Sequence, residues 1–144
     1  MEYKQLIQKR WADLDPNFHL RHSVYYDYGT QLRLQFLHEH GVTAEVMLKN
    51  SFGPILFREE AVYKREVKFE DPIYINLTLH KCRKDYSRWT MQHHITKADG
   101  TLCCIITIDG AWFDTRARKL AAALPEVVTM MNAMPKSAEF TWLD

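Results

Sequence analysis

The spacing of apolar residues changes from helical to alternating near Pro54, and this change constrains the fold more than any other feature of the chain. Before it, apolar residues recur at helical spacing from about Ser23 to His40, on more than one side of the expected helix. After it, apolar and polar residues alternate in four segments, which span about 61–69, 73–79, 89–95 and 102–113. Clean alternation in successive strands predicts an antiparallel sheet with one covered face.

Three further segments complete the expected order of elements. Residues 3–11 alternate well enough for a first strand, and residues 42–54 are expected to connect the long helix to the sheet. Pro125 suits the first position of a short helix that ends near Met134. The sequence therefore predicts an α+β fold, in which a five-stranded antiparallel sheet wraps around one long central helix and a short C-terminal helix follows. The apolar terminal residues Phe140, Trp142 and Leu143 are expected to lie against a partner subunit.

Composition narrows the class of protein. A chain of 144 residues is most simply one domain, residues 1–144, and is long enough to bury a core. A net charge of +1 lacks the basic bias that nucleic acid binding usually needs. No stretch has the apolar length of a signal peptide or a membrane span, so we expect a cytoplasmic protein with no membrane partner. Because Cys103 and Cys104 are adjacent and the cysteine count is odd, a disulfide framework is not expected.

Residues 11–28 join the first strand to the long helix, and two acids, Asp13 and Asp15, precede the proline at position 16. Asp13 and Asp15 are expected on the same side of an extended chain, since side chains alternate along a strand. Pro16 disfavours helix at Asp15, which is therefore placed at the junction of strand and helix. A carboxylate there faces the backbone N–H groups of a helix start, where a developing oxyanion can be stabilised. Without further information, a helix cap is the simpler interpretation of Asp15.

This segment resembles that of the hot-dog fold acyl-CoA thioesterases of the 4-hydroxybenzoyl-CoA thioesterase type. Their segment has Asp-x-Asp, a short turn, histidine, small residues, tyrosine and a long helix. The matching positions are Asp13, Asp15, His19, His22, Ser23 and Tyr25. Two positions depart from the family pattern: Phe18 replaces a common glycine, and Arg21 stands where asparagine or tyrosine is usual. The order of later elements agrees over roughly residues 3–128.

The resemblance implies a hot-dog acyl-CoA thioesterase that works as a homodimer or homotetramer. Its active sites would lie where the helix start of one subunit meets its neighbour. Asp15 would activate a water molecule as general base or attack the thioester carbonyl directly, and His22 would orient the carbonyl or the water. Asp13 is the alternative acid, but the Asp15-Pro16 pair favours Asp15. No cofactor is expected, since coenzyme A (CoA) is part of the substrate.

Four further residues are predicted to bind the substrate. Tyr25 matches a family tyrosine and is expected to line an acyl pocket, whereas His19 either contacts the substrate or packs as a turn residue at the sheet edge. Arg58 and Arg88 are candidates for the phosphates of CoA, as are Arg116, Arg118 and Lys119. The chain contains no glycine-rich phosphate loop.

Other histidines and cysteines are expected to have no role in the chemistry. No metal site is predicted. The three possible zinc ligands, Asp15, His19 and His22, lie within eight residues of a turn that contains a proline, and this arrangement suits a tetrahedral site poorly. The pair His93-His94 lies in a predicted strand, with one side chain inward and one outward. Cys103 and Cys104 lie in an apolar strand, where thiols are inert.

Two alternative functions remain open from the sequence. Residues 13–19, DLDPNFH, come near the motif of hot-dog enoyl-CoA hydratases, although the order of proline and asparagine is inverted. A non-catalytic protein that holds acyl thioesters is the third class. The sequence leaves open the acyl preference, the choice between CoA and acyl carrier protein, and the choice between dimer and tetramer.

Overall fold

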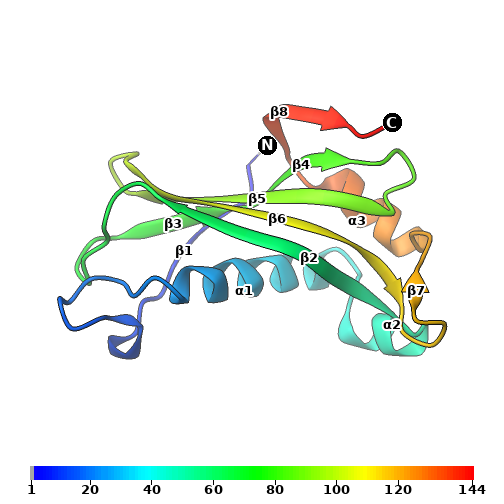
Figure 1. The fold of residues 1–144 in the computed structure, drawn as a ribbon, viewed down its shortest axis with the longest axis horizontal. Coiled ribbons are helices and arrows are strands. Elements are labelled where there is room, and N and C mark those ends of the chain that lie inside the picture. The colour runs from blue at the N-terminus through cyan, green and yellow to red at the C-terminus, as the bar shows by residue number, and fades with distance from the viewer. Residues whose placement is uncertain (1) are drawn as a thin grey trace.

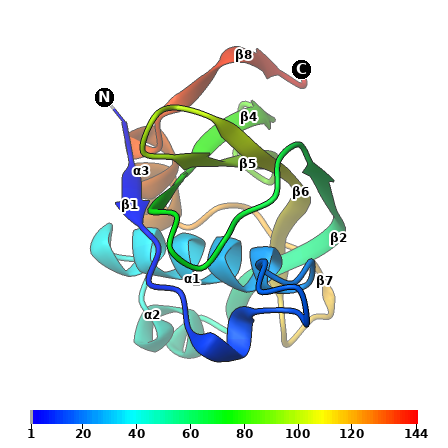
Figure 2. The ribbon, with the colours of Figure 1, turned by 90° about the vertical axis from the view of Figure 1, so that its left-hand side faces the viewer.

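In the computed structural model, which describes residues 2–144, a curved sheet wraps around the long helix α1 (Figures 1 and 2). The elements are β1 (Lys4–Leu6), a 3-10 helix (Trp11–Asp13), α1 (Val24–Glu39), α2 (Ala44–Lys49), β2 (Phe52–Tyr63), β3 (Ile73–Asn76), β4 (Thr78–Cys82), β5 (Arg88–Lys97), β6 (Leu102–Asp114), β7 (Lys119–Leu120), α3 (Pro125–Ala133) and β8 (Lys136–Trp142). Within these residues, no helix is long and apolar enough to cross a membrane.

The main part of the sheet is antiparallel. Strands β3 and β4 follow each other along one edge of β5, where Ile75 lies opposite Ile95 and Leu79 lies opposite Met91. The order across the sheet is therefore β1, then β3 with β4, then β5, β6 and β2. The predicted fold class, an antiparallel sheet wrapped around one long helix, is confirmed for the described residues, but the sheet has eight strands rather than the five expected.

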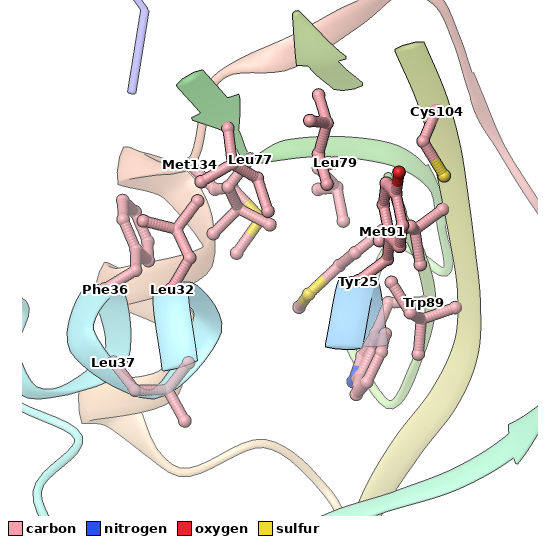
Figure 3. Packing of buried hydrophobic residues seen from close by; sticks show 14 of the residues in the cluster. Tyr25, Leu32, Phe36, Leu37, Leu77, Leu79, Trp89, Met91, Cys104 and Met134 are labelled. Atoms are coloured by element: carbon pink, nitrogen blue, oxygen red, sulfur yellow. The ribbon is translucent and has the colours of Figure 1, made fainter. Parts of the chain in front are cut away.

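Helix α1 packs its apolar face into the concave side of this sheet. Leu32 and Phe36 point toward Leu77, Leu79 and Met91 (Figure 3). Burying side chains of this size stabilises the fold by about 1.5–3 kcal/mol each. The backbone at Gly29 approaches β5 so closely that a Cβ there would lie 3.0 Å from the ring of His93.

The two ends of α1 agree with the prediction, and its second apolar side is covered in part. Glu39 ends the helix, and Gly41 follows with a φ of 88°, a conformation that glycine adopts without strain. Of the two leucines off the main apolar stripe, Leu37 is buried, whereas Leu34 is 42% exposed.

The strand before the polar turn at Asp71 was predicted in the wrong place. The strand was predicted at about 61–69, but β2 spans Phe52–Tyr63 and ends before Val67. The segment 42–54, predicted as a connection, contains α2 and the first residues of β2. Helix α2 begins where the Thr43 hydroxyl accepts a hydrogen bond from the Val46 amide at 3.2 Å. The first strand is also shorter than predicted, because Trp11–Asp13 forms a 3-10 helix.

The C-terminal segment is partly as predicted. Helix α3 begins with Pro125 and buries Val127, Met130 and Met131. Beyond it, β8 was not predicted and pairs in parallel with β4, with Trp142 opposite Cys82. The rings of Phe140 and Trp142 pack edge to face at 5.0 Å, and Trp142 remains 40% exposed.

Candidate functional site

Asp15 begins a tight turn that its own side chain stabilises. The turn is closed by the Asp15 amide, which donates to the His19 carbonyl at 2.8 Å. Asp15 Oδ1 accepts hydrogen bonds from the amides of Asn17 at 2.9 Å and His19 at 3.2 Å. Asp15 Oδ2 has no hydrogen-bond partner among residues 2–144. One carboxylate oxygen is therefore held while the other is available to a ligand.

Phe18 occupies the strained position of this turn. Its φ is 63°, in the left-handed region that favours glycine, and its side chain is 67% exposed. This geometry explains why the corresponding family position is commonly glycine. The turn keeps its shape with phenylalanine because the hydrogen bonds around Asp15 hold it.

The start of α1 has no side-chain cap. Ser23 stands at the N-cap position, but its side chain caps no helix amide, and its Oγ accepts a hydrogen bond from Arg21 Nη1 at 2.7 Å. Asp15 bonds to its own turn, so the interpretation of Asp15 as the cap of α1 is wrong. The Val24 amide donates to the Arg21 carbonyl at 3.2 Å, so it is the next N–H groups of α1, with the positive end of its dipole, that can stabilise a negatively charged oxygen.

Asp13 is a buried structural acid. The prediction that it shares an extended strand face with Asp15 is wrong, because Asp13 ends the 3-10 helix and is fully buried. Its carboxylate accepts hydrogen bonds from Arg10 Nη2 at 2.7 Å and from the Tyr28 hydroxyl at 2.8 Å. Burial alone would raise the pKa of Asp13, but the bonds from Arg10 and Tyr28 outweigh it and lower the pKa.

An open depression of about 340 Å³ lies beside Asp15. It is lined by Asp15, His19, Leu20, His22, Tyr25, Tyr63, Lys64, Arg65 and Glu66. The Tyr63 hydroxyl donates to the His22 carbonyl at 2.7 Å, which ties the end of β2 to the start of α1. The rings of Tyr25 and Tyr63 pack edge to face at 5.1 Å, and burial raises the pKa of Tyr25. Four of the predicted site residues thus share one depression.

The two predicted arginines lie elsewhere in this chain. Glu59 of β2 faces α1, so its neighbours Arg58 and Glu60 point to the opposite face of the sheet. Arg58 Nη2 lies 2.6 Å from Glu60 Oε2, and the guanidinium of Arg88 lies 4.8 Å from the ring centre of Phe57. Lys64 and Arg65 line the depression instead, although sequence reasoning did not single them out.

A buried polar cluster joins α1 to β5 away from the depression. Arg33 Nη1 lies 2.9 Å from His93 Nε2, and His93 Nδ1 lies 2.7 Å from the Asn76 carbonyl. Burial, together with the charge of Arg33, lowers the pKa of His93 to about 3, so its ring is neutral. Its neighbour His94 is half-buried on the other face, as the strand alternation predicted.

Among residues 2–144, no three His, Cys, Asp or Glu side chains are grouped so that they could hold a metal ion. In particular, His19 Nδ1 lies 3.4 Å from Glu66 Oε2, and the Asp15 carboxylate accepts its bonds from backbone amides.

Comparison with known proteins identifies a family and a fold. The model of the thioesterase-like superfamily matches residues 9–130. No curated protein matches the chain. A hypothetical protein of Staphylococcus aureus, solved in complex with CoA, is 18% identical with a TM-score of 0.85, and the match covers 96% of this chain and 89% of that one.

Two thioesterase structures are also similar to this chain. A 1,4-dihydroxy-2-naphthoyl-CoA thioesterase from Synechocystis is 14% identical with a TM-score of 0.80, over 92% of this chain and 97% of that one. A DHNA-CoA thioesterase from S. aureus is 16% identical with a TM-score of 0.73, over 84% and 80%. At these identities the likeness shows the fold, and it confirms the predicted hot-dog architecture.

Proposed function

Since the chain belongs to the thioesterase-like superfamily, we propose that it hydrolyses acyl-CoA thioesters to free acid and CoA, with Asp15 as the catalytic carboxylate. The observation that carries this proposal is the geometry of Asp15. Its Oδ1 is held by two backbone amides, its Oδ2 has no partner among residues 2–144, and it lines a depression beside the uncapped start of α1.

The chemistry requires a nucleophile and a place for negative charge. The carboxylate of Asp15 either attacks the thioester carbonyl carbon or takes a proton from an attacking water molecule. The carbonyl oxygen becomes negatively charged at this step, and the N–H groups at the start of α1 stabilise it. The CoA thiolate then leaves without a strong acid. After direct attack, the acyl group is left on Asp15 as an anhydride, and water hydrolyses it to the free acid and the regenerated carboxylate. His22 and His19 line the same depression and orient the carbonyl or the water.

Recognition of CoA needs positive charge near the depression. Lys64 and Arg65 line it and are exposed, which suits contact with the phosphates of a bound nucleotide. Arg58 and Arg88 remain candidates for the same role through a second subunit. Tyr25 contributes an apolar ring to the wall of the depression.

We further propose that the protein works as a homodimer, or as a tetramer built from such dimers. Strand β2 pairs with β6 on one side and forms an edge of the sheet on the other. Its exposed apolar residues are Leu56, Phe57, Val62 and Tyr63. A long apolar edge strand is normally covered. If two copies of β2 pair in antiparallel orientation around Glu59, Arg58 of each lies opposite Glu60 of the other, so the edge is complementary to itself.

The proposed function is tested by measuring thiol release from a panel of acyl-CoA thioesters. Hydrolysis of at least one member at a rate proportional to enzyme concentration is the expected result. Loss of the ultraviolet absorption of an enoyl-CoA without thiol release would instead identify a hydratase. Tight binding without turnover of any member would identify an acyl-thioester carrier.

A further inference from the structure

Three aromatic side chains gather at the end of the molecule that contains Asp15. Trp11 is 71% exposed and Phe18 is 67% exposed, although rings of this size are mostly buried in folded proteins. The ring of Trp11 stacks on that of Phe69, with ring centres 4.5 Å apart and an angle of 15° between the planes. The chain therefore leaves most of Trp11 and Phe18 in contact with water.

Backbone pairing places Phe18 beside this stack. His19 and Lys68 form an antiparallel bridge. Phe18 precedes the bridge on one segment and Phe69 follows it on the other, so the two residues lie at opposite positions. In Figure 1 the two segments meet at the left-hand end, where the chain before α1 approaches the connection from β2 to β3. We call Trp11, Phe18 and Phe69 the aromatic tip.

The fold itself gives no reason for phenylalanine at position 18. Its φ of 63° disfavours any residue with a Cβ, and its ring lies outside the hydrophobic core. The ring does not line the depression beside Asp15 either. Glycine would remove both the backbone strain and the exposed apolar surface. A residue that is unfavourable in both respects indicates a role in contact with another molecule.

We propose that the aromatic tip inserts into the interfacial region of a lipid bilayer, so that the protein binds membranes peripherally. Exposed aromatic rings gain free energy at the boundary between lipid and water, where their apolar surface leaves the solvent. The segments that carry the tip, 9–21 and 64–71, contain six Lys and Arg residues and five Asp and Glu residues. Because these charges nearly balance, the rings rather than the charges carry the binding. This contact replaces the expectation that the protein has no membrane partner.

A lipid surface suits the tip better than a protein partner does. The exposed rings project from turns, and a protein partner would need a concave site that matches their shape. A bilayer accepts projecting rings without a matched shape. Asp15 belongs to the same turn as Phe18, so insertion of the tip brings the depression beside Asp15 to the lipid surface. On the basis of the proposed function, thioesters whose acyl chain is dissolved in the bilayer are then presented to Asp15.

Membrane binding is tested by cosedimentation of the full-length protein with vesicles, without any thioester. Vesicles of phosphatidylcholine, and vesicles of equal parts phosphatidylcholine and phosphatidylglycerol, should both bind wild type. The two affinities should differ by less than about threefold, because the charge near the tip is balanced. Phe18→Gly should weaken binding by about tenfold, since it removes one inserted ring. Its Tm should stay near that of wild type, because glycine adopts a φ of 63° without strain.

Leu48→Ser is the matched control for the loss of an exposed apolar side chain. Leu48 is 81% exposed on α2, which lies at the opposite end of the molecule from the tip (Figure 1). This variant should bind vesicles like wild type. Absence of vesicle binding by wild type, or equal binding by wild type and Phe18→Gly, would overturn the proposal. A raised dissociation constant of the Phe18→Gly dimer without lipid would place the tip between subunits and would overturn it as well.

Tryptophan fluorescence tests whether the rings themselves enter the bilayer. Of the four tryptophans, Trp89 and Trp112 are buried and Trp142 lies on β8, so Trp11 is the one at the tip. Lipids brominated in their acyl chains should quench part of the wild-type emission. This quenching should disappear in Trp11→Phe, which keeps an aromatic ring to stack on Phe69. Quenching that persists in Trp11→Phe would place the membrane contact elsewhere and would refute the tip as the inserted element. Because no thioester is present, neither experiment depends on whether the protein hydrolyses one.

Discussion

Asp13 and Asp15 are separated by one residue, yet their carboxylates lie in different surroundings. Asp13 is fully buried and accepts hydrogen bonds from Arg10 and Tyr28, so it holds the 3-10 helix against α1. Asp15 is partly exposed, and one of its oxygens has no partner within residues 2–144. A buried acid whose hydrogen bonds are all made typically has a structural role. An acid that is fixed by hydrogen bonds but still has one accessible oxygen is the better candidate for catalysis.

Asp13→Asn should lower stability and leave the chemistry intact. The amide would lose the negative charge that accepts from Arg10 and would place an NH₂ group where Asp13 accepts now. We expect a loss of about 1–3 kcal/mol in the free energy of unfolding, measured by urea denaturation. Turnover per folded molecule should stay within about threefold of wild type, since Asp13 does not line the depression. A large loss of turnover in a stable variant would move the catalytic role to Asp13.

Several residues of the candidate site could be predicted because a motif fixes their spacing. Asp15, His19, His22 and Tyr25 lie within eleven positions and share the depression. Tyr63 and Lys64 could not be predicted, because their approach depends on the long-range contact between the end of β2 and the start of α1. Arg58 and Arg88 lie outside the depression, so the predicted contact of either residue with CoA would require a second subunit.

At the scale of elements, α1 and β5 are joined by a buried polar contact between Arg33 and His93. Because His93 is buried, its pKa falls from 6.5 to about 3 in the folded state. Between these pH values the unfolded chain binds one more proton than the folded chain. The contribution of His93 to stability is therefore complete above pH 6.5 and is lost as the pH falls toward 3.

Wild type should accordingly lose stability on acidification faster than His93→Gln. The expected difference in slope is up to about 1.4 kcal/mol per pH unit between pH 6 and pH 4.5. It is measured by urea denaturation at several pH values, and other titrating groups cancel because both proteins contain them. The glutamine side chain of this variant can still accept from Arg33 and donate to the Asn76 carbonyl, so the variant should fold. Parallel pH profiles of the two proteins would show that folding does not lower the pKa of His93.

The elements that could be predicted from the sequence are those with one face in the core. Regularly spaced apolar residues are buried in α1, α3, β5 and β6, so the spacing of apolar residues in the sequence predicts these elements. Strand β2 has both faces partly exposed because it forms an edge, and its first residues include Pro54, which an edge strand tolerates. Strand β8 pairs with β4 across more than fifty residues of sequence, a contact that local pattern does not specify.

At the scale of the whole molecule, the edge of β2 is expected to form the dimer interface. Arg58→Glu would place like charges opposite each other twice in a symmetric dimer, and should raise the dissociation constant by roughly five- to thirtyfold. The double variant Arg58→Glu with Glu60→Arg restores opposite charges and should recover the wild-type constant. Sedimentation velocity over a concentration series measures the dissociation constants of both variants. An Arg58→Glu protein that dimerises like wild type would place the interface elsewhere.

The central claim is that Asp15 carries thioester hydrolysis, and the kinetics of Asp15→Asn test it most directly. The side-chain oxygen of the introduced asparagine can still accept from the amides of Asn17 and His19, so the turn should persist and Tm should stay near that of wild type. Turnover of a thioester that wild type hydrolyses should fall by about 10²–10⁴-fold. Near-normal thiol release by a folded Asp15→Asn protein would contradict the assignment.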